Sequence, residues 1–289
     1  MSRAKTFREL IRATEILQIP CCYDGASAKV LEQTGFKAIA AAGYGLSGSL
    51  LGMPDIGLLS GPEMVNQYKN ISDAVDVPLF VDIDTGFGDV NNVIRAVRDA
   101  EEAGVAGLFI EDQTYPKRCG HMAGKNVVDV ADYLPKLKAA LWARRDPDFV
   151  ITARTDSLAV HGLDEAVRRA KIFADVGADM VFVEAVHTVE EMQKINAVLH
   201  ERDTPSMANI IEGGDTPLLS VGELQDLGYS AVAYPCGAIF AAITAVQDWA
   251  RHVLHDGGPQ EVASSYMNFD EYFDFIGANA IRQRESKFV

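Results

Sequence analysis

The feature that most constrains the fold of this chain is a regular alternation of two kinds of segment. Short apolar runs each end in a turn and lead into a segment with helical periodicity. The alternation repeats eight times, and we expect strand–helix pairs at 19–24 and 26–33, 38–43 and 62–75, 78–84 and 91–103, 107–113 and 132–145, 149–156 and 164–175, 180–185 and 189–201, 207–211 and 221–227, and 231–235 and 238–255. Continuous runs of Val, Ile, Phe and Ala are typical of strands that are covered on both faces, which predicts a parallel sheet.

Eight strand–helix units in about 250 residues predict an α/β protein closed into a (β/α)₈ TIM-type barrel. The alternative is a doubly wound open sheet, but no Gly-x-Gly-x-x-Gly fingerprint follows the first expected strand. No linker or low-complexity tract divides the chain, so we expect 1–289 to form a single barrel domain. The tail, about 257–289, is rich in aromatic residues, and we expect it to pack on the barrel or on a partner subunit.

Charge and composition exclude several classes of protein. The formal net charge is −15, from 26 basic and 41 acidic residues, which argues against nucleic acid or an anionic membrane as a partner. No apolar stretch reaches the ~18 residues of a membrane span, and the first residues lack the apolar core of a secretory signal. Four cysteines do not form a disulfide framework, which favours a reduced, cytoplasmic setting. An acidic protein that binds an anion must hold local positive charge.

Polar residues gather at the carboxyl ends of the expected strands, where barrels of this class carry their active sites. Six ends contribute them: Gly43, Tyr44 and Gly45 with Asp55 beyond; Asp82 and Asp84; Glu111; Arg154 and Ser157; Glu184; and Asn209. Asp82 and Asp84 are two apart on an expected strand, so their side chains share one face. With Glu111 and Glu184 they offer oxygen ligands to a hard cation such as Mg²⁺, which takes one or two carboxylates directly and keeps several waters. The alternative is that a carboxylate caps a helix or pairs with a lysine.

Two of these ends are suited to an anionic ligand. Arg154 can grip a carboxylate with two parallel hydrogen bonds, which lysine cannot do; the alternative is a structural ion pair with Asp84 or Glu184. The backbone N–H groups of Gly43-Tyr44-Gly45 can receive an anion, although a simple turn explains this pattern equally well.

The segment Lys-Arg-Cys-Gly-His at 117–121 carries the strongest single signal. Cys119 lies among Lys117, Arg118 and His121, and neighbouring cations are expected to lower the pKa of a thiol. The usual alternative is an inert buried cysteine, which we expect of the other cysteines, Cys21, Cys22 and Cys236. Zinc is excluded because no second Cys/His pair at metal spacing is present.

These motifs resemble those of the isocitrate lyase and phosphoenolpyruvate mutase superfamily over nearly the whole chain. The resemblance rests on 117–121, Val-Asp-Ile-Asp-Thr-Gly-Phe-Gly at 81–88, Ala-Arg-Thr-Asp at 153–156 and Asn-Ile-Ile-Glu-Gly-Gly at 209–214. The cysteine motif is similar to that of the carbon–carbon lyase branch, which includes methylisocitrate lyases, 2,3-dimethylmalate and other alkylmalate lyases, the petal death protein and fungal oxaloacetate hydrolases. Ala40, Ala42 and Phe109 depart from the methylisocitrate lyase pattern. Ser157, directly after the arginine motif, resembles the oxaloacetate hydrolases, where it is associated with binding the hydrated ketone.

The resemblance implies a barrel whose last helix is swapped between subunits, a homotetramer built as a dimer of dimers, and Mg²⁺ or Mn²⁺ as cofactor. It also implies roles for single residues. The metal shell would be Asp82, Asp84 and Glu111; the substrate contacts would be Gly43, Tyr44, Gly45, Asp55, Gly120, Glu184, Asn209 and Ser157; and the catalytic set would be Lys117, Cys119, His121, Arg154 and Glu111, with Cys119 as the general acid on a mobile loop.

The chemistry implied is that of an oxo-acid-lyase. A 2-hydroxy dicarboxylate of the 2-alkylmalate, 2,3-dimethylmalate or methylisocitrate type would be cleaved to pyruvate and a second carboxylic acid. The alternative within the class is hydrolysis of oxaloacetate to oxalate and acetate. A second alternative is a non-catalytic barrel that binds dicarboxylates.

Overall fold

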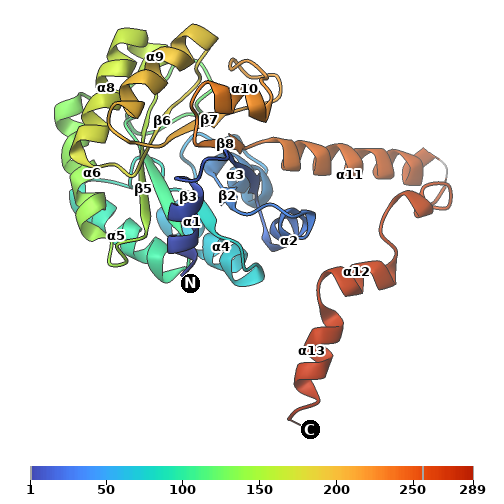
Figure 1. Ribbon diagram of the computed structural model, residues 1–289. Coiled ribbons are helices and arrows are strands. Elements are labelled where there is room, and N and C mark those ends of the chain that lie inside the picture. Colours follow the sequence, from blue (N-terminus) through green and yellow to red (C-terminus); the bar gives the residue numbers. More distant parts are fainter. Residues whose placement is uncertain (1, 256, 289) are drawn as a thin grey trace. The chain divides into compact units, whose positions relative to one another are not determined.

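A computed structural model describes residues 2–255 and 257–288 and confirms the (β/α)₈ barrel. Eight parallel strands close in the order β1 to β8, with helices on the outside (Figure 1). The strands are β1 (Leu17–Cys22), β2 (Ile39–Ala41), β3 (Leu79–Asp82), β4 (Gly107–Glu111), β5 (Val150–Thr155), β6 (Met180–Val183), β7 (Ser206–Asn209) and β8 (Ala231–Tyr234). The helices are α1 (Arg3–Leu10), α2 (Gly25–Thr34), α3 (Gly43–Leu51), α4 (Gly61–Ala74), α5 (Val90–Glu102), α6 (Val130–Ala143), α7 (Ser157–His161), α8 (Leu163–Val176), α9 (Val189–His200), α10 (Val221–Asp226), α11 (Gly237–His255), α12 (Phe269–Phe275) and α13 (Ala278–Glu285), with a short 3₁₀ turn, η1 (Ala263–Ser265).

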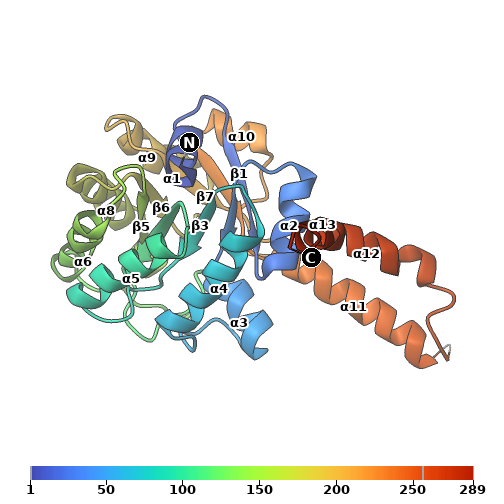
Figure 2. The same cartoon turned by 90° about the horizontal axis from the view of Figure 1, so that it is seen from below.

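Local sequence signals explain where the outer helices begin and which face they bury. Helix α5 starts at a capping box in which Asp89 and Asn92 satisfy each other's backbone N–H groups. Its buried positions, Val93, Ala96, Val97 and Ala100, follow the spacing of a single apolar stripe. Helices α4, α5, α6, α8 and α9 lie around the outside of the strands, as the view from below shows (Figure 2).

The barrel interior is filled by side chains rather than open. Phe80, Phe109 and Phe182 point inward from β3, β4 and β6, while their strand neighbours face the helices. Their rings follow one another at centroid separations of 5.6 and 5.9 Å, and Phe7 of α1 adds a further ring 5.2 Å from Phe80. This aromatic floor leaves space for a ligand only at the carboxyl-terminal rim.

Two strand ends differ from the expected ones. Strand β3 stops at Asp82, and Asp84 lies beyond it in the left-handed region with φ of 48°. The expected alternation along one strand therefore does not bring these two carboxylates together; a turn does, because Asp84 N–H donates to Asp82 Oδ1 at 2.7 Å. Likewise, Gly43 does not end a strand but begins helix α3, an element that the alternation did not predict.

The chain divides into two compact units, Met1–Ala238 and Ile239–Val289. The second contains most of α11, together with η1, α12 and α13, and exposes large apolar side chains such as Val246, Leu254 and Phe269. Whether this tail packs on a partner, and whether its helix is swapped, stay predictions. Among the described helices, none is both long and apolar enough to cross a membrane.

Candidate active site

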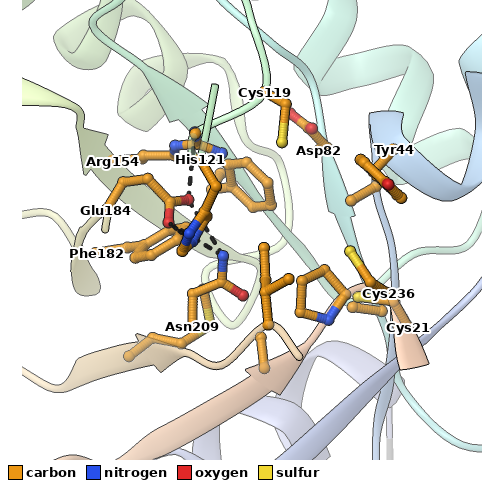
Figure 3. A pocket seen from close by; sticks show the side chains of 18 of the residues that line it. Cys21, Tyr44, Asp82, Cys119, His121, Arg154, Phe182, Glu184, Asn209 and Cys236 are labelled. Atoms are coloured by element: carbon orange, nitrogen blue, oxygen red, sulfur yellow. Dashed lines mark hydrogen bonds and ion pairs between the residues drawn. The ribbon is translucent and has the colours of Figure 1, made fainter. Parts of the chain in front are cut away.

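A cavity opens at the carboxyl-terminal rim of the barrel. Figure 3 shows side chains from several strand ends that point into it. Its lining includes nine residues chosen from the sequence: Tyr44, Asp55, Asp82, Cys119, Gly120, His121, Arg154, Glu184 and Asn209. The aromatic floor forms its base, so the cavity is polar along one wall and apolar below. Such a pocket suits a small carboxylic acid with an apolar substituent.

Arg154 is the most heavily contacted side chain of the cavity. The register of β4 and β5 pairs it directly with Glu111, whose Oε2 lies 3.3 Å from Arg154 Nη1. Two parallel hydrogen bonds of 2.9 and 3.1 Å join its guanidinium to Asp156, and Glu184 Oε2 lies 3.3 Å from Nη2. Arg154 also lies over the rings of Phe109 and Phe182, which adds cation–π attraction. Its orientation is therefore fixed before any ligand arrives.

Glu184 connects Arg154 to the loop that carries Cys119. Its Oε1 accepts a hydrogen bond from Asn209 at 3.1 Å and lies 3.1 Å from His121 Nε2. Burial opposes ionisation, but Arg154 and His121 outweigh it and lower the pKa of Glu184 to about 2. His121 Nδ1 in turn accepts the N–H of Asp215 at 3.1 Å. Glu184 is thus a buried carboxylate anion that anchors the loop.

Lys117 is buried beneath the cavity and does not line it. Its Nζ lies 2.6 Å from Asp55 Oδ1 and 2.9 Å from Asp84 Oδ1. A Cβ atom placed on Gly43 would lie only 2.9 Å from this ammonium and 2.8 Å from Asp55 Oδ1, so any larger residue there would displace this ion pair. Asp84 therefore pairs with a lysine, which was the alternative to a metal-binding role for these carboxylates.

The carboxylates expected to hold a metal are buried with too few donors. Among the described residues, neither oxygen of Glu111 accepts a hydrogen bond of good geometry, although Oε2 lies 3.3 Å from Arg154 Nη1, and Oδ1 of Asp84 is approached by the Lys117 ammonium at 2.9 Å. Burial raises the pKa of Asp84 to about 7 and also raises the pKa values of Asp82 and Glu111. A divalent cation would relieve this penalty. Within the described residues no three His, Cys, Asp or Glu side chains converge to hold an ion alone.

Cys119 lies over the cavity with its backbone N–H bonded to Asp55 O at 3.0 Å. Burial raises the pKa of its thiol and outweighs both the hydrogen bond from the His121 backbone and the charge of Arg154. The expected lowering is therefore wrong, because burial of the thiol, together with the nearby charges of Glu184 and Asp55, outweighs the neighbouring cations. The thiol remains protonated at neutral pH.

The structure differs from the sequence-based expectation at three residues of the rim: Gly45, Ser157 and Asp156. Gly45 packs in the first turn of α3 and, like Ser157, is not among the residues that line the cavity. Ser157 is fully buried, with its Oγ 2.8 Å from Thr155 Oγ1. Asp156, the bidentate partner of Arg154, was not selected from the sequence, although it stands in the same Ala-Arg-Thr-Asp motif.

The closed barrel, the rim cavity and its convergent carboxylates, arginine and thiol define a (β/α)₈-barrel enzyme. The family model described as Phosphoenolpyruvate phosphomutase matches residues 7–254, and the chain belongs to this family, within the isocitrate lyase and phosphoenolpyruvate mutase superfamily. The resemblance deduced from the sequence motifs is thereby confirmed.

The similar proteins include lyases and hydrolases. A 2,3-dimethylmalate lyase of Eubacterium barkeri is 40% identical over 289 residues, which is 100% of this chain and 99% of the relative. The solved structure of an oxaloacetate acetylhydrolase bound to 3,3-difluorooxalacetate superposes with a TM-score of 0.93 at 30% identity, covering 99% of this chain and 97% of that one. A phosphonopyruvate hydrolase in complex with oxalate and Mg²⁺ gives a TM-score of 0.88 at 30% identity, covering 100% and 99%. The lyase relatives confirm the predicted enzyme class, a carbon–carbon lyase.

Proposed function

We propose that this enzyme cleaves the C2–C3 bond of a 2-hydroxy acid with two or three carboxylates, of the 2-alkylmalate, 2,3-dimethylmalate or methylisocitrate type, and depends on Mg²⁺ or Mn²⁺. The products are pyruvate and a second carboxylic acid. One observation carries the proposal: a protonated thiol, Cys119, lines the same cavity as Arg154 and Asp82. A neutral thiol above an arginine suits the protonation of a carbanion next to a carboxylate.

The chain's own residues account for most steps of such a cleavage. The 2-hydroxyl proton leaves to a basic group of the pocket, the C2–C3 bond breaks, and its electron pair passes to C3 of the departing acid. Arg154 stabilises the charge that grows on that acid's carboxylate. Cys119 donates its proton to C3, and the loop that carries it excludes water. Asp82, Asp84 and Glu111 would hold the metal ion, which would supply Lewis-acid stabilisation of negative charge on the substrate's oxygens.

The cavity also suggests where the substrate's alkyl group lies. Ala40 and Ala42 from the β2 end, with Ala233 and Cys236 from the β8 end, give the cavity an apolar wall of small side chains. These small side chains leave room for methyl or ethyl substituents. This wall supports alkylmalates over dicarboxylates that carry a further charged group.

Hydrolysis of oxaloacetate is the second candidate, and the close superposition on an oxaloacetate acetylhydrolase favours it. Its substrate lacks the alkyl group, so the apolar wall would remain empty. The two activities differ in their products: pyruvate appears in one case and oxalate in the other.

The proposal is tested with a panel of 2-methylmalate, 2,3-dimethylmalate, 2-methylisocitrate and oxaloacetate, each with Mg²⁺. Pyruvate is followed by coupled reduction, and oxalate by chromatography. Cys119→Ser should lower turnover by at least about 100-fold while the fold and metal binding persist. Met122→Leu, an exposed change in the same loop, is the matched control. Absence of turnover on every member would favour the non-catalytic barrel, and full activity in Cys119→Ser would remove Cys119 as the acid.

The proposal extends to the assembly. Val246, Leu254, Phe269 and Met267 of the tail are between 58% and 77% exposed, and apolar surface of this kind usually marks a contact with another chain. We therefore expect a homotetramer in which the tail packs on a neighbouring subunit, which sedimentation analysis would detect.

A further inference from the structure

The loop that carries Cys119 is fastened at its base. Gln113 and Val127 form an antiparallel bridge, and Thr114 N–H donates to Asn126 O at 2.9 Å. These two pairs form the neck of the loop, and the residues between them form a tip that carries Cys119, Gly120 and His121. Because the neck stays paired at the rim, the tip can open only by changes in the backbone torsions of the residues between the two neck pairs.

Lys125 stands at this neck, yet its side chain reaches both the tip and the arginine network. The side chain is only 5% exposed. Its Nζ donates to the carbonyl oxygen of Gly120, the residue next to Cys119. The same Nζ lies 3.5 Å from Oδ1 of Asp156, the carboxylate that holds Arg154 by two hydrogen bonds.

A buried ammonium needs compensation for the water it has lost. Lys125 finds it in the Gly120 carbonyl at the tip and in the carboxylate of Asp156, which directly follows β5, so its compensation is complete only while the tip is closed. Opening the tip removes the Gly120 carbonyl from Lys125. It also leaves the ammonium to compete with Arg154 for Asp156, which disturbs the group that grips the substrate.

We propose that Lys125 is a positioning residue: it holds the tip closed and couples closure to the orientation of Arg154. This inference rests on the proposed role of Cys119 as the acid, since Lys125 fixes the backbone beside that thiol. Lys125 does not itself line the cavity and is not among the described partners of the carboxylates assigned to the metal site; it acts through Gly120 and Asp156.

The test replaces Lys125 with Met, which keeps the apolar stem and removes the charge, and with Gln, which keeps a donor for the Gly120 carbonyl. Lys138→Met, an exposed position on α6, is the matched control. Lys125→Met should lower kcat by about 100-fold and change KM by less than about threefold, because the pocket is intact but Cys119 is misplaced. Lys125→Gln should fall between this variant and the wild type.

A second readout does not depend on turnover. Iodoacetamide labelling of Cys119 in the ligand-free protein, located by peptide mass spectrometry, reports how often the tip opens. Lys125→Met should be labelled at least about tenfold faster than the wild type, as expected from the loss of a charge-assisted hydrogen bond, and Lys138→Met at the wild-type rate. If Lys125→Met does not fold, Lys125→Gln carries the same two measurements.

Each outcome either supports or overturns the positioning role of Lys125. A low kcat with fast labelling supports the positioning role. Wild-type kcat, or a low kcat with labelling at the wild-type rate, overturns it. If the wild-type protein turns over none of the panel substrates, the proposed function fails, whereas the labelling rates still decide whether Lys125 holds the tip.

Discussion

Gly120 offers the sharpest test of whether the closed tip is the active conformation. A Cβ atom on this residue would lie 2.4 Å from Glu184 Cγ and 2.7 Å from Arg154 Nη2. Carbon atoms in favourable contact are about 3.5–4.0 Å apart, so a displacement of about 1 Å is required. Glu184 cannot yield, because Asn209 and Arg154 both hold it. The tip must move instead.

A displacement of about 1 Å at a reacting group lowers the rate by about 100-fold, equivalent to about 2.7 kcal/mol in the activation free energy. Gly120→Ala should therefore lower kcat by about two orders of magnitude. The melting temperature should hardly change, because the open tip relieves the clash. Gly222→Ala is the matched control, since a Cβ there meets nothing within 4 Å.

The assay is steady-state turnover of the best panel substrate, together with thermal unfolding and the labelling rate of Cys119. Gly120→Ala should be labelled faster than the wild type. Turnover within about threefold of the wild type would refute the reasoning, because it would show that the contact between the tip and Glu184 is not needed for catalysis.

Three further predictions concern the buried polar network. In protein stripped of metal by EDTA, Asp84 has a pKa of about 7 in the folded state, against about 3.9 in the unfolded chain. The free energy of unfolding should therefore fall as the pH rises from about 4 to about 7. Asp84→Asn should flatten this pH dependence in urea titrations, and an unchanged pH dependence would contradict the raised pKa of Asp84. Arg154→Lys should lower kcat/KM by at least about 100-fold because lysine lacks the planar fork; near-normal kinetics would exclude a bidentate role. Ser157→Ala should leave the ratio of lyase to hydrolase activity unchanged and lower the free energy of unfolding by about 1 kcal/mol, because Ser157 contacts Thr155 rather than the cavity; a changed product ratio would restore it as a substrate contact.

The sequence was sufficient for the barrel and for most of the rim. A repeated strand–helix alternation specifies a parallel barrel, and parallel strands bring their carboxyl ends to one edge. Tyr44, Cys119, Arg154, Glu184 and Asn209 could therefore be placed together without knowledge of a single contact.

The features that could not be predicted from the sequence depend on ion pairs between residues that are distant along the chain. Lys117 lies beside Cys119 in sequence, but its charge is directed to Asp55 and Asp84. The thiol of Cys119 is instead governed by its burial, with smaller contributions from Glu184 and Asp55, and its pKa moves in the direction opposite to the expected one. The role of Lys125 could not be predicted from the sequence for the same reason, because Lys125 and Asp156 meet only in the folded chain.

The aromatic floor limits how an enzyme with this barrel can diversify. Phe80, Phe109 and Phe182 pack on one another inside the barrel, and truncating a buried phenylalanine typically costs 3–5 kcal/mol of the 5–15 kcal/mol by which a protein is stable. A deeper cavity is therefore hard to reach by single mutations. Ala42, Ile211 and Pro235 line the rim above the floor, and substitutions there alter the cavity without removing the floor. Adaptation to longer or bulkier acids should accordingly accumulate at the rim, while the floor drifts only between residues of similar volume.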